Sequence, residues 1–392
     1  MTYETMDYRS QPNEAYTHAL VIGCGYPGLP SLGYPTLSGS ACGKFWTPGL
    51  SASWFVEWLF GMYHEPGCGF ENCRAPLGTV EFLGPEDDRF VFPGDSTASN
   101  LTTPKFDEIE SAFSDWIYRI SLNPHSQGIF YFCGHGLIDG EDHILLSDGF
   151  TGAGDGQYGV WHESFNMTDS VEGASRKVHG ALYFFIDACM EFDKDVILSK
   201  RPPRGLIDWK IDEPVLSSDH VYLRGAKPGN LSFAPTDGVA NFTRALLKVL
   251  SGFCGQQGGN IPYWANWQMV LNGTATLLRR DMQSDLNRQE ISMVGSGNGS
   301  SVLRTSNNAP KVILGVDVSP GGYRPNIVVW ADGPALSRRE EVTLSSSHED
   351  MELIQHIYQI GIAAPPGAAF ANQERQNVWL LPPLVEQTFK LP

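Results

Sequence analysis

The chain has 392 residues, of which 27 are Lys or Arg and 44 are Asp or Glu, so its formal net charge is −17. Nucleic acids and anionic membranes attract basic surfaces, so an acid surplus of this size argues against either as a partner bound through bulk charge. Hydrophobic residues make up 42% of the chain and aromatic residues 11%, which is typical of a folded protein with a sizeable core.

Three features bear on the cellular compartment. Met1–Asn13 is polar and lacks the apolar core of a signal peptide. No apolar run approaches the roughly 20 residues of a membrane span. The seven cysteines are odd in number and scattered, unlike a disulfide framework. We therefore expect a soluble, cytoplasmic chain with reduced cysteines.

The first third of the chain contains two apolar runs and two helical patterns. His18–Ile22 and Thr79–Leu83 are short apolar runs, typical of buried strands. Ser51–Tyr63 is apolar almost all round, which predicts a buried helix. Apolar residues at helical spacing predict an amphipathic helix over Phe106–Ile120.

The strongest strand signals lie in the middle of the chain. Gly128–Cys133 and Ala181–Ile186 are continuous apolar runs, and His143–Leu146 and Val221–Leu223 are shorter candidates. An apolar stripe then predicts a helix over Phe242–Leu250. Continuous apolar strands separated by helices predict an α/β fold with a mostly parallel sheet covered on both faces.

The composition changes near the C-terminal end. Residues 295–310 are rich in Gly, Ser and Asn, which predicts a linker. Beyond it, Val312–Val318 and Asn326–Trp330 are runs of the β type. We therefore expect a main domain over residues 1–294, a linker over 295–310 and a small, mainly β domain over 311–392.

Gly23–Gly28 formally matches the G-x-G-x-x-G fingerprint of dinucleotide-binding proteins. That fingerprint needs a helix beginning under the glycines and an acidic residue about 20 positions on. Here Pro27 and Pro30 disrupt a helix start, and no acidic residue lies between Glu14 and Glu57. We expect the glycines to shape a loop at the carboxyl end of a strand instead.

His64, Cys68 and Cys73 form a second weak pattern. A structural zinc site needs four ligands, and no fourth candidate lies nearby. We interpret these residues as loop residues and predict no metal site.

Two predicted strands end in reactive side chains, His135 after the first central strand and Cys189 after the second. An imidazole beside a thiol can generate the nucleophilic thiolate and later protonate a leaving amine. The backbone N–H groups of Gly136 and Cys189 could then hold an oxyanion. Taken singly, a buried cysteine or a strand-end histidine is more often a packing residue. The pair at two strand ends favours catalysis.

These residues carry a resemblance to a known family. Tyr131–Gly136 (YFCGHG) resembles the histidine motif of the caspase-like cysteine peptidases, with Cys133 where serine is usual, and Ile186–Cys189 (IDAC) resembles the nucleophile strand. Gly238–Leu247 is similar to a helix in the small-subunit half of that family. The likeness covers about residues 15–285 and is greater to metacaspases and prokaryotic caspase homologues than to animal caspases.

The resemblance implies a three-layer αβα fold and endopeptidase activity by a His/Cys dyad that needs no cofactor. His135 would be the general acid and base, and Cys189 the nucleophile. Protein or peptide substrates follow, without nucleic acid or membrane partners. Such proteins are common in stress and antiviral defence operons, so a defence role is an association.

Asp187 stands where metacaspase-like members have an aspartate that lines the pocket for a basic residue. A carboxylate there would select Arg or Lys before the cleaved bond. The alternative is that Asp187 only organises the loop through hydrogen bonds. The second pocket aspartate of metacaspases is replaced by Gly43. Asp148 is a candidate for calcium binding, so activation by Ca²⁺ stays open.

The segment after the nucleophile is basic. Lys200, Arg201 and Arg204 are candidate self-processing sites of a zymogen, and an upstream protein activator is the other route to activity. The alternative is an exposed basic loop that is not cut. The rival function is a catalytically silent scaffold that keeps this fold and binds protein partners through its C-terminal domain.

Overall fold

The structure is a computed structural model. It describes residues 2–5, 14–26, 46–63, 68–85, 88–150, 162–192, 203–235, 238–259, 261–282, 289–297, 299–325, 327–344 and 349–392.

A seven-stranded sheet forms the centre of the main domain, in the order β1-β3-β2-β6-β10-β12-β15. The inner strands β3, β2, β6, β10 and β12 are mutually parallel, whereas β1 and β15 are antiparallel edge strands. The mostly parallel sheet predicted from the sequence is confirmed. The strands span β1 Thr2–Glu4, β2 Thr17–Gly23, β3 Leu77–Leu83, β6 Gln127–Gly134, β10 Leu182–Ala188, β12 His220–Arg224 and β15 Ser292–Ser296.

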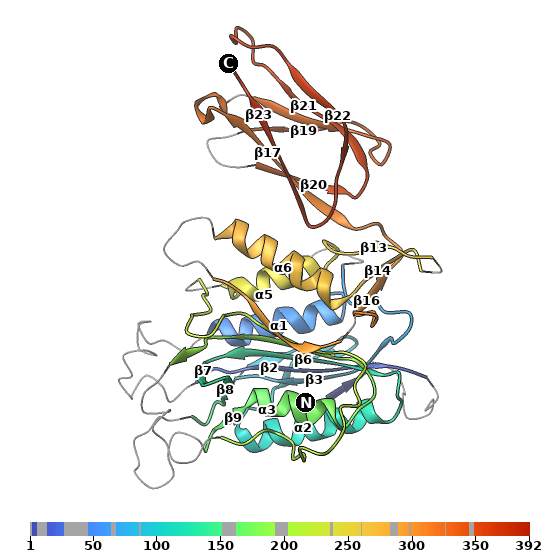
Figure 1. The fold of residues 1–392 in the computed structure, drawn as a ribbon, viewed down its shortest axis with the longest axis vertical. Coiled ribbons are helices and arrows are strands. Elements are labelled where there is room, and N and C mark those ends of the chain that lie inside the picture. Colours follow the sequence, from blue (N-terminus) through green and yellow to red (C-terminus); the bar gives the residue numbers. More distant parts are fainter. Residues whose placement is uncertain are drawn as a thin grey trace.

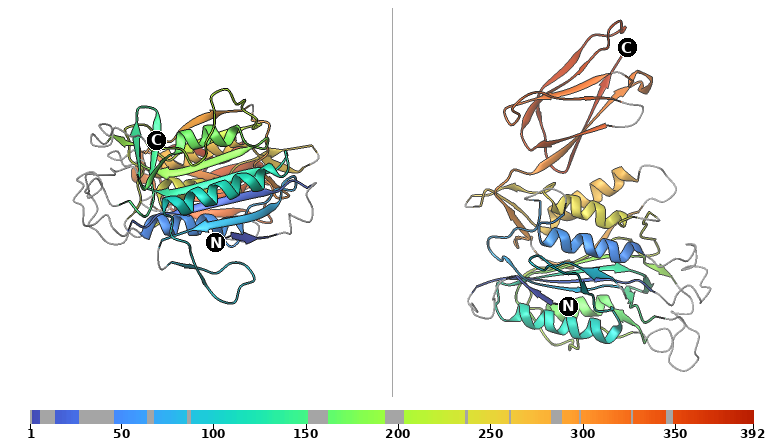
Figure 2. Two further views of the ribbon diagram at one scale, coloured as in Figure 1. Left: turned by 90° about the horizontal axis from the view of Figure 1, so that it is seen from below. Right: turned by 180° about the vertical axis from the view of Figure 1, so that it is seen from behind.

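Helices cover both faces of this sheet, which gives the three layers seen in Figure 1 and, from the opposite side, in Figure 2. One face carries α1 (Trp46–Leu59), α5 (Asn241–Leu250) and α6 (Trp267–Asp281). The other carries α2 (Phe106–Ser121) and α3 (Met167–Ser175). The predicted αβα architecture is confirmed.

Apolar side chains of the central strands point alternately to the two faces of the sheet, so both faces must be covered by helices. On β6, Ile129 and Tyr131 enter the cluster under α1 and α5, whereas Phe130 and Phe132 enter the cluster under α2. Every β10 residue from Leu182 to Ala188 is buried in the same alternating way. Successive side chains of a strand point to opposite faces, so a strand buried on both sides reads as a continuous apolar run.

Smaller sheets extend from this core. Four short strands in the order β11-β7-β8-β9 begin where β6 and β10 end: β7 Gly136–Asp139, β8 Asp142–Leu146, β9 Ser164–Asn166 and β11 Glu191–Phe192. Two further groups are β4 Arg89–Phe90 with β5 Ser99–Asn100, and β13 Gln256–Gln257 with β14 Tyr263–Ala265 and β16 Arg304–Ser306.

The segment predicted as a linker contains ordered, buried structure. Strand β15 extends to Ser296 in the central sheet, and β16 pairs with β14. Leu303 is fully buried, and the Asn72 side chain donates hydrogen bonds to the carbonyls of Val302 and Leu303. The linker prediction is therefore wrong for residues 302–306. A Gly/Ser/Asn-rich composition reports backbone freedom but not what the chain is packed against.

The C-terminal residues form two sheets, β20-β17-β23 and β19-β18-β21-β22, around a separate apolar cluster. Its mainly β character is as predicted, and the division of the chain at 294 and 311 stays a prediction. The strands span β17 Lys311–Ser319, β18 Val328–Asp332, β19 Glu340–Thr343, β20 Glu349–Ile354, β21 Ile357–Ala363, β22 Gln373–Trp379 and β23 Leu384–Lys390, and η2 is a short 3₁₀ helix at Gly321–Tyr323. None of the helices in the described ranges is long and apolar enough to cross a membrane.

Candidate active site

The register of two parallel strands leaves His135 and Cys189 at the ends of adjacent strands. β6 and β10 are neighbours, and their last registered pair is Gly134 with Ala188. His135 and Cys189 are the next residue on each strand, so both leave the sheet at its carboxyl edge. Ligands and reacting groups of α/β proteins gather at this edge.

The Cys189 thiol is half-buried and contacts the backbone of Ser232. Its Sγ lies 3.3 Å from the Ser232 nitrogen, which donates to it, and 3.7 Å from the Ser232 carbonyl oxygen. Burial raises the pKa of Cys189 to about 11, and the nearby Glu191 and Asp187 carboxylates act in the same direction. The hydrogen bond from Ser232 opposes this shift but is outweighed. The thiol is therefore protonated at neutral pH.

His135 packs against Tyr26. The Tyr26 hydroxyl accepts from the His135 backbone nitrogen at 2.7 Å and donates to the carbonyl of Leu146 at 2.8 Å. The two rings pack with their centroids 4.7 Å apart. Burial lowers the pKa of His135 to about 4, so the imidazole is neutral at pH 7 and can accept a proton.

Gly136, predicted to supply an oxyanion donor, packs directly against the nucleophile strand. A Cβ atom at this position would lie 2.6 Å from the carbonyl oxygen of Cys189 and 2.6 Å from Nε2 of His143. Both contacts are too short for any side chain, so only glycine fits. The ends of β6 and β10 are thus held in van der Waals contact beside the thiol.

His143 is a buried residue that the sequence did not single out. Its Nε2 lies 3.0 Å from the Cys189 carbonyl, which can only accept, so this nitrogen carries the proton. Its Nδ1 then accepts from the Tyr222 hydroxyl at 2.5 Å. Burial lowers the pKa of His143 to about 3 and raises that of Tyr222, so both stay neutral. His143 is therefore a fixed hydrogen-bond donor to the backbone of Cys189.

Asp187, two residues before Cys189 on β10, is only 2% exposed. Its Oδ1 accepts from the Ser232 hydroxyl at 2.5 Å, and its Oδ2 accepts from the backbone N–H and the hydroxyl of Thr243, at 3.0 and 2.6 Å. Thr243 is in the first turn of α5, whose N-cap residue Ala240 has no capping side chain. Asp187 supplies that missing cap from β10, because unpaired N–H groups at a helix start attract a carboxylate.

The polar network extends beyond Asp187. Gln289 Nε2 donates to the Ser232 hydroxyl at 2.8 Å and to the Gly225 carbonyl at 2.6 Å, while its Oε1 accepts from the Phe233 nitrogen. These contacts fix the segment that covers the thiol. Nothing in the local sequence around Ser232 or Gln289 could have identified them, because their partners are more than 40 positions away.

The other predicted residues lie elsewhere. Arg204 bridges to Glu110 on α2, and its carbonyl accepts from the Asn166 nitrogen at 2.9 Å. Asp148 accepts from the Tyr26 backbone nitrogen at 2.9 Å. Lys200, Arg201, Gly43 and His64 lie outside the described residues. Among the residues that the structure describes, no three His, Cys, Asp or Glu side chains form a metal-binding group, and Ca²⁺ activation stays a prediction.

Comparison with known proteins identifies the family of the chain. The family model described as caspase domain, a peptidase family, matches residues 53–283, which is more than half of the chain. This chain belongs to the caspase-domain family. It is also 33% identical over 296 residues to the uncharacterized protein y4kE of Sinorhizobium fredii, covering 73% of this chain and 84% of that protein. A crystal structure of caspase-1 from Spodoptera frugiperda aligns with a TM-score of 0.40 and 11% identity, over 75% of this chain and 90% of that one.

The pKa values of the pair predict the pH dependence of thiol reactivity. Because the pKa of Cys189 is about 11, its alkylation rate by iodoacetamide should rise about tenfold per pH unit from about pH 7 to 10. Glu191→Gln removes a charge that raises this pKa, so it should increase the rate at a fixed pH, whereas the distant Glu386→Gln should not. Mass spectrometry of the Cys189 peptide measures the rate. A plateau reached below pH 7 would instead mean a preformed thiolate–imidazolium pair.

The fixed tautomer of His143 predicts a difference between two buried tyrosines on adjacent strands. Tyr222→Phe leaves Nδ1 of His143 buried without its donor, which should lower the free energy of unfolding by about 1–3 kcal/mol. Tyr183→Phe is the matched control, because Tyr183 packs on the opposite face of the sheet. Urea denaturation measures both variants. If both variants lost the same free energy of unfolding, the hydrogen bond between Tyr222 and His143 would make no specific contribution to stability.

Proposed function

We propose that this caspase-domain chain is a cysteine endopeptidase that uses His135 and Cys189. The observation that carries the proposal is the register of β6 and β10, which places the two residues at adjacent strand ends. A neutral imidazole and a protonated thiol at adjacent strand ends fit the starting state of a general-base mechanism.

The proposed reaction follows from these protonation states. His135 takes the thiol proton as Sγ of Cys189 attacks the carbonyl carbon of the scissile bond, and the carbonyl electrons move onto oxygen. The N–H groups of Gly136 and Cys189 are the proposed donors to that oxyanion. The tetrahedral intermediate then expels the amine, which takes its proton from His135, and leaves a thioester. Water, deprotonated by His135, hydrolyses the thioester.

We propose Arg or Lys as the substrate residue before the cleaved bond, with Asp187 as its partner. Burial raises the pKa of the Asp187 carboxyl, and its contacts are hydroxyl and amide groups rather than a cation. A buried carboxylate of this kind gains from a guanidinium or ammonium group that offsets its desolvation. In the resting structure the Ser232 hydroxyl occupies Oδ1, so the substrate cation must displace it.

A fluorogenic peptide panel tests both proposals. Substrates with Arg, Lys or Asp before the cleaved bond are assayed with and without Ca²⁺, beside Cys189→Ala. Arg and Lys peptides should be hydrolysed, and Asp187→Asn should lower kcat/KM for them about 10- to 100-fold, because it removes the charge but keeps an acceptor for Thr243. The exposed Asp208→Asn is the control.

The outcomes of the panel separate the proposals from their rivals. A preference for Asp would remove the specificity role of Asp187 while keeping the dyad. Turnover no higher than that of Cys189→Ala, with all variants folded by circular dichroism, would favour the silent scaffold. If the chain is a scaffold, Cys189→Ala should still bind the same protein partner as wild type.

We propose that the chain is made as a zymogen and cut in the basic segment after the nucleophile. The protonated thiol, held by Ser232, supports a resting state of low activity. Arg204 is a poor candidate for the cut, because Glu110 holds its side chain and Asp169 accepts from the nitrogen of Gly205 at 3.1 Å. Lys200 and Arg201 are better candidates. A role in stress or antiviral defence stays a prediction.

Intact-mass spectrometry of wild type beside Cys189→Ala tests self-processing. Wild type should yield a fragment that ends at Lys200 or Arg201, the double variant Lys200→Gln/Arg201→Gln should abolish it, and Arg204→Gln should leave it unchanged. Identical masses for wild type and Cys189→Ala, apart from the substitution, would contradict self-processing. A fragment that ends at Arg204 would contradict our inference that the contacts around Arg204 make it a poor candidate for the cut.

A further inference from the structure

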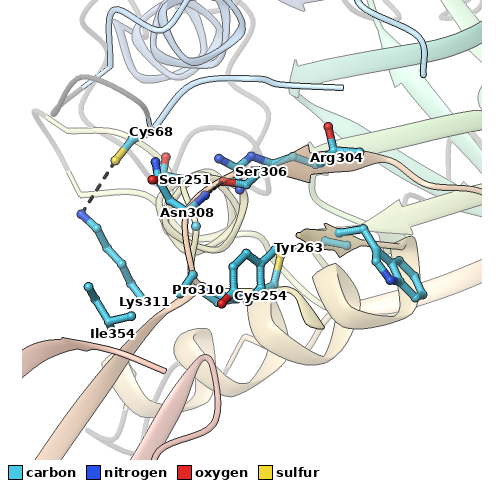
Figure 3. A pocket seen from close by; sticks show the side chains of 15 residues that line it. Cys68, Ser251, Cys254, Tyr263, Arg304, Ser306, Asn308, Pro310, Lys311 and Ile354 are labelled. Carbon is cyan, nitrogen blue, oxygen red and sulfur yellow. Dashed lines mark hydrogen bonds between the residues drawn. The ribbon is translucent and has the colours of Figure 1, made fainter. Parts of the chain in front are cut away.

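A pocket of about 250 Å³ lies where the C-terminal β domain meets the main domain. Its walls come from three places: the end of α5, the sheet formed by β14 and β16, and the first residues of β17 with Ile354 of β20. Figure 3 shows the Lys311 side chain reaching Cys68 at one end of the pocket, with Arg304 toward the other end. The pocket shares no residue with the dyad or its hydrogen-bonding network.

Ion pairs and a backbone hydrogen bond join the two domains near the pocket. Lys248 of α5 pairs with Glu352 at 2.7 Å, and Arg280 of α6 pairs with Asp350. The Lys311 backbone nitrogen also donates to the Gly252 carbonyl at 2.8 Å. These contacts fix the wall formed by the β domain against the end of α5.

The charge of the lining is opposite to that of the whole chain. Among the described residues that line the pocket, Arg304 and Lys311 are cations and none is Asp or Glu, although the chain has a net charge of −17. Arg304 is only 4% exposed, and its Nε donates a hydrogen bond to the Gly69 carbonyl at 3.4 Å. Burying a guanidinium is costly unless an anion offsets the lost hydration.

A second buried group in the wall points to the same kind of ligand. Ser251, the C-cap residue of α5, is 8% exposed, and its hydroxyl has no hydrogen-bond partner among the described residues. Buried polar atoms are nearly always satisfied by protein, water or ligand. A hydroxyl and a guanidinium in one pocket together form a donor set for an oxyanion.

We propose that this pocket binds a small organic anion. A phosphate or carboxylate group would lie between Arg304 and Lys311 and accept from Ser251, while an apolar body packs against Tyr263 and Ile354. The volume is at the lower end of small-molecule sites, which suits one ring rather than a dinucleotide. The proposal does not depend on the peptidase activity.

Isothermal titration calorimetry of the full chain carrying Cys189→Ala tests the pocket. Phenyl phosphate and phenylacetate share an aromatic body and differ in the anionic group, so they distinguish the two ligand chemistries, and benzyl alcohol is the neutral control. At fixed ionic strength at least one anion should bind with a Kd below about 1 mM, and benzyl alcohol should not. Loss of a charge-assisted hydrogen bond in Lys311→Gln should weaken that binding about tenfold or more.

Matched variants keep the test independent of folding. Ser251→Met fills the pocket from the end of α5 and should abolish binding, and the exposed Lys210→Gln, outside the pocket, should leave the Kd unchanged. Arg304→Gln is interpreted only if its circular dichroism spectrum matches wild type. Binding of neither anion, equal binding of benzyl alcohol, or equal weakening by Lys311→Gln and Lys210→Gln would overturn the proposal.

Discussion

The parallel pairing of β6 with β10 is the constraint on which the rest of the site depends. Seven consecutive residue pairs join the strands, from Gly128 with Leu182 to Gly134 with Ala188. A slip of one residue would turn every side chain of a strand to the opposite face, and both faces are filled with aromatic rings. The packing of the core therefore fixes the register, and the register leaves His135 and Cys189 at the ends of adjacent strands.

The same burial that fixes the strands sets the chemistry of their ends. Desolvation disfavours charge on both members of the dyad, so the resting pair is neutral. Burial also disfavours the charged form of Asp187, two residues before Cys189, and the hydroxyl groups of Ser232 and Thr243 offset part of this effect. A substrate cation that paired with this carboxylate would offset the desolvation of Asp187. The binding energy gained in this way could displace the Ser232 hydroxyl from Oδ1.

Sequence reasoning identified what local patterns encode. The strands read as apolar runs because they are buried on both faces, and His135 and Cys189 stand out as candidates because each directly follows such a run. His143, Ser232 and Gln289 were missed because each acts through a partner on a distant element, and no local pattern marks such a contact. The predicted linker failed for a related reason. Leu303 is fully buried, and its carbonyl accepts from Asn72, which lies more than 200 positions earlier in the chain.

Helix α5 relates the active site to the pocket between the domains. Thr243 in its first turn donates to Asp187, and Ser251, its C-cap, lines the pocket. A helix of ten residues is about 15 Å long, so the two contacts lie about that far apart along its axis. An axial shift of α5 would alter the Thr243–Asp187 contacts at one end and the position of Ser251 at the other. The β domain, paired to α5 through Lys248, therefore contacts the element that caps the floor of the active site.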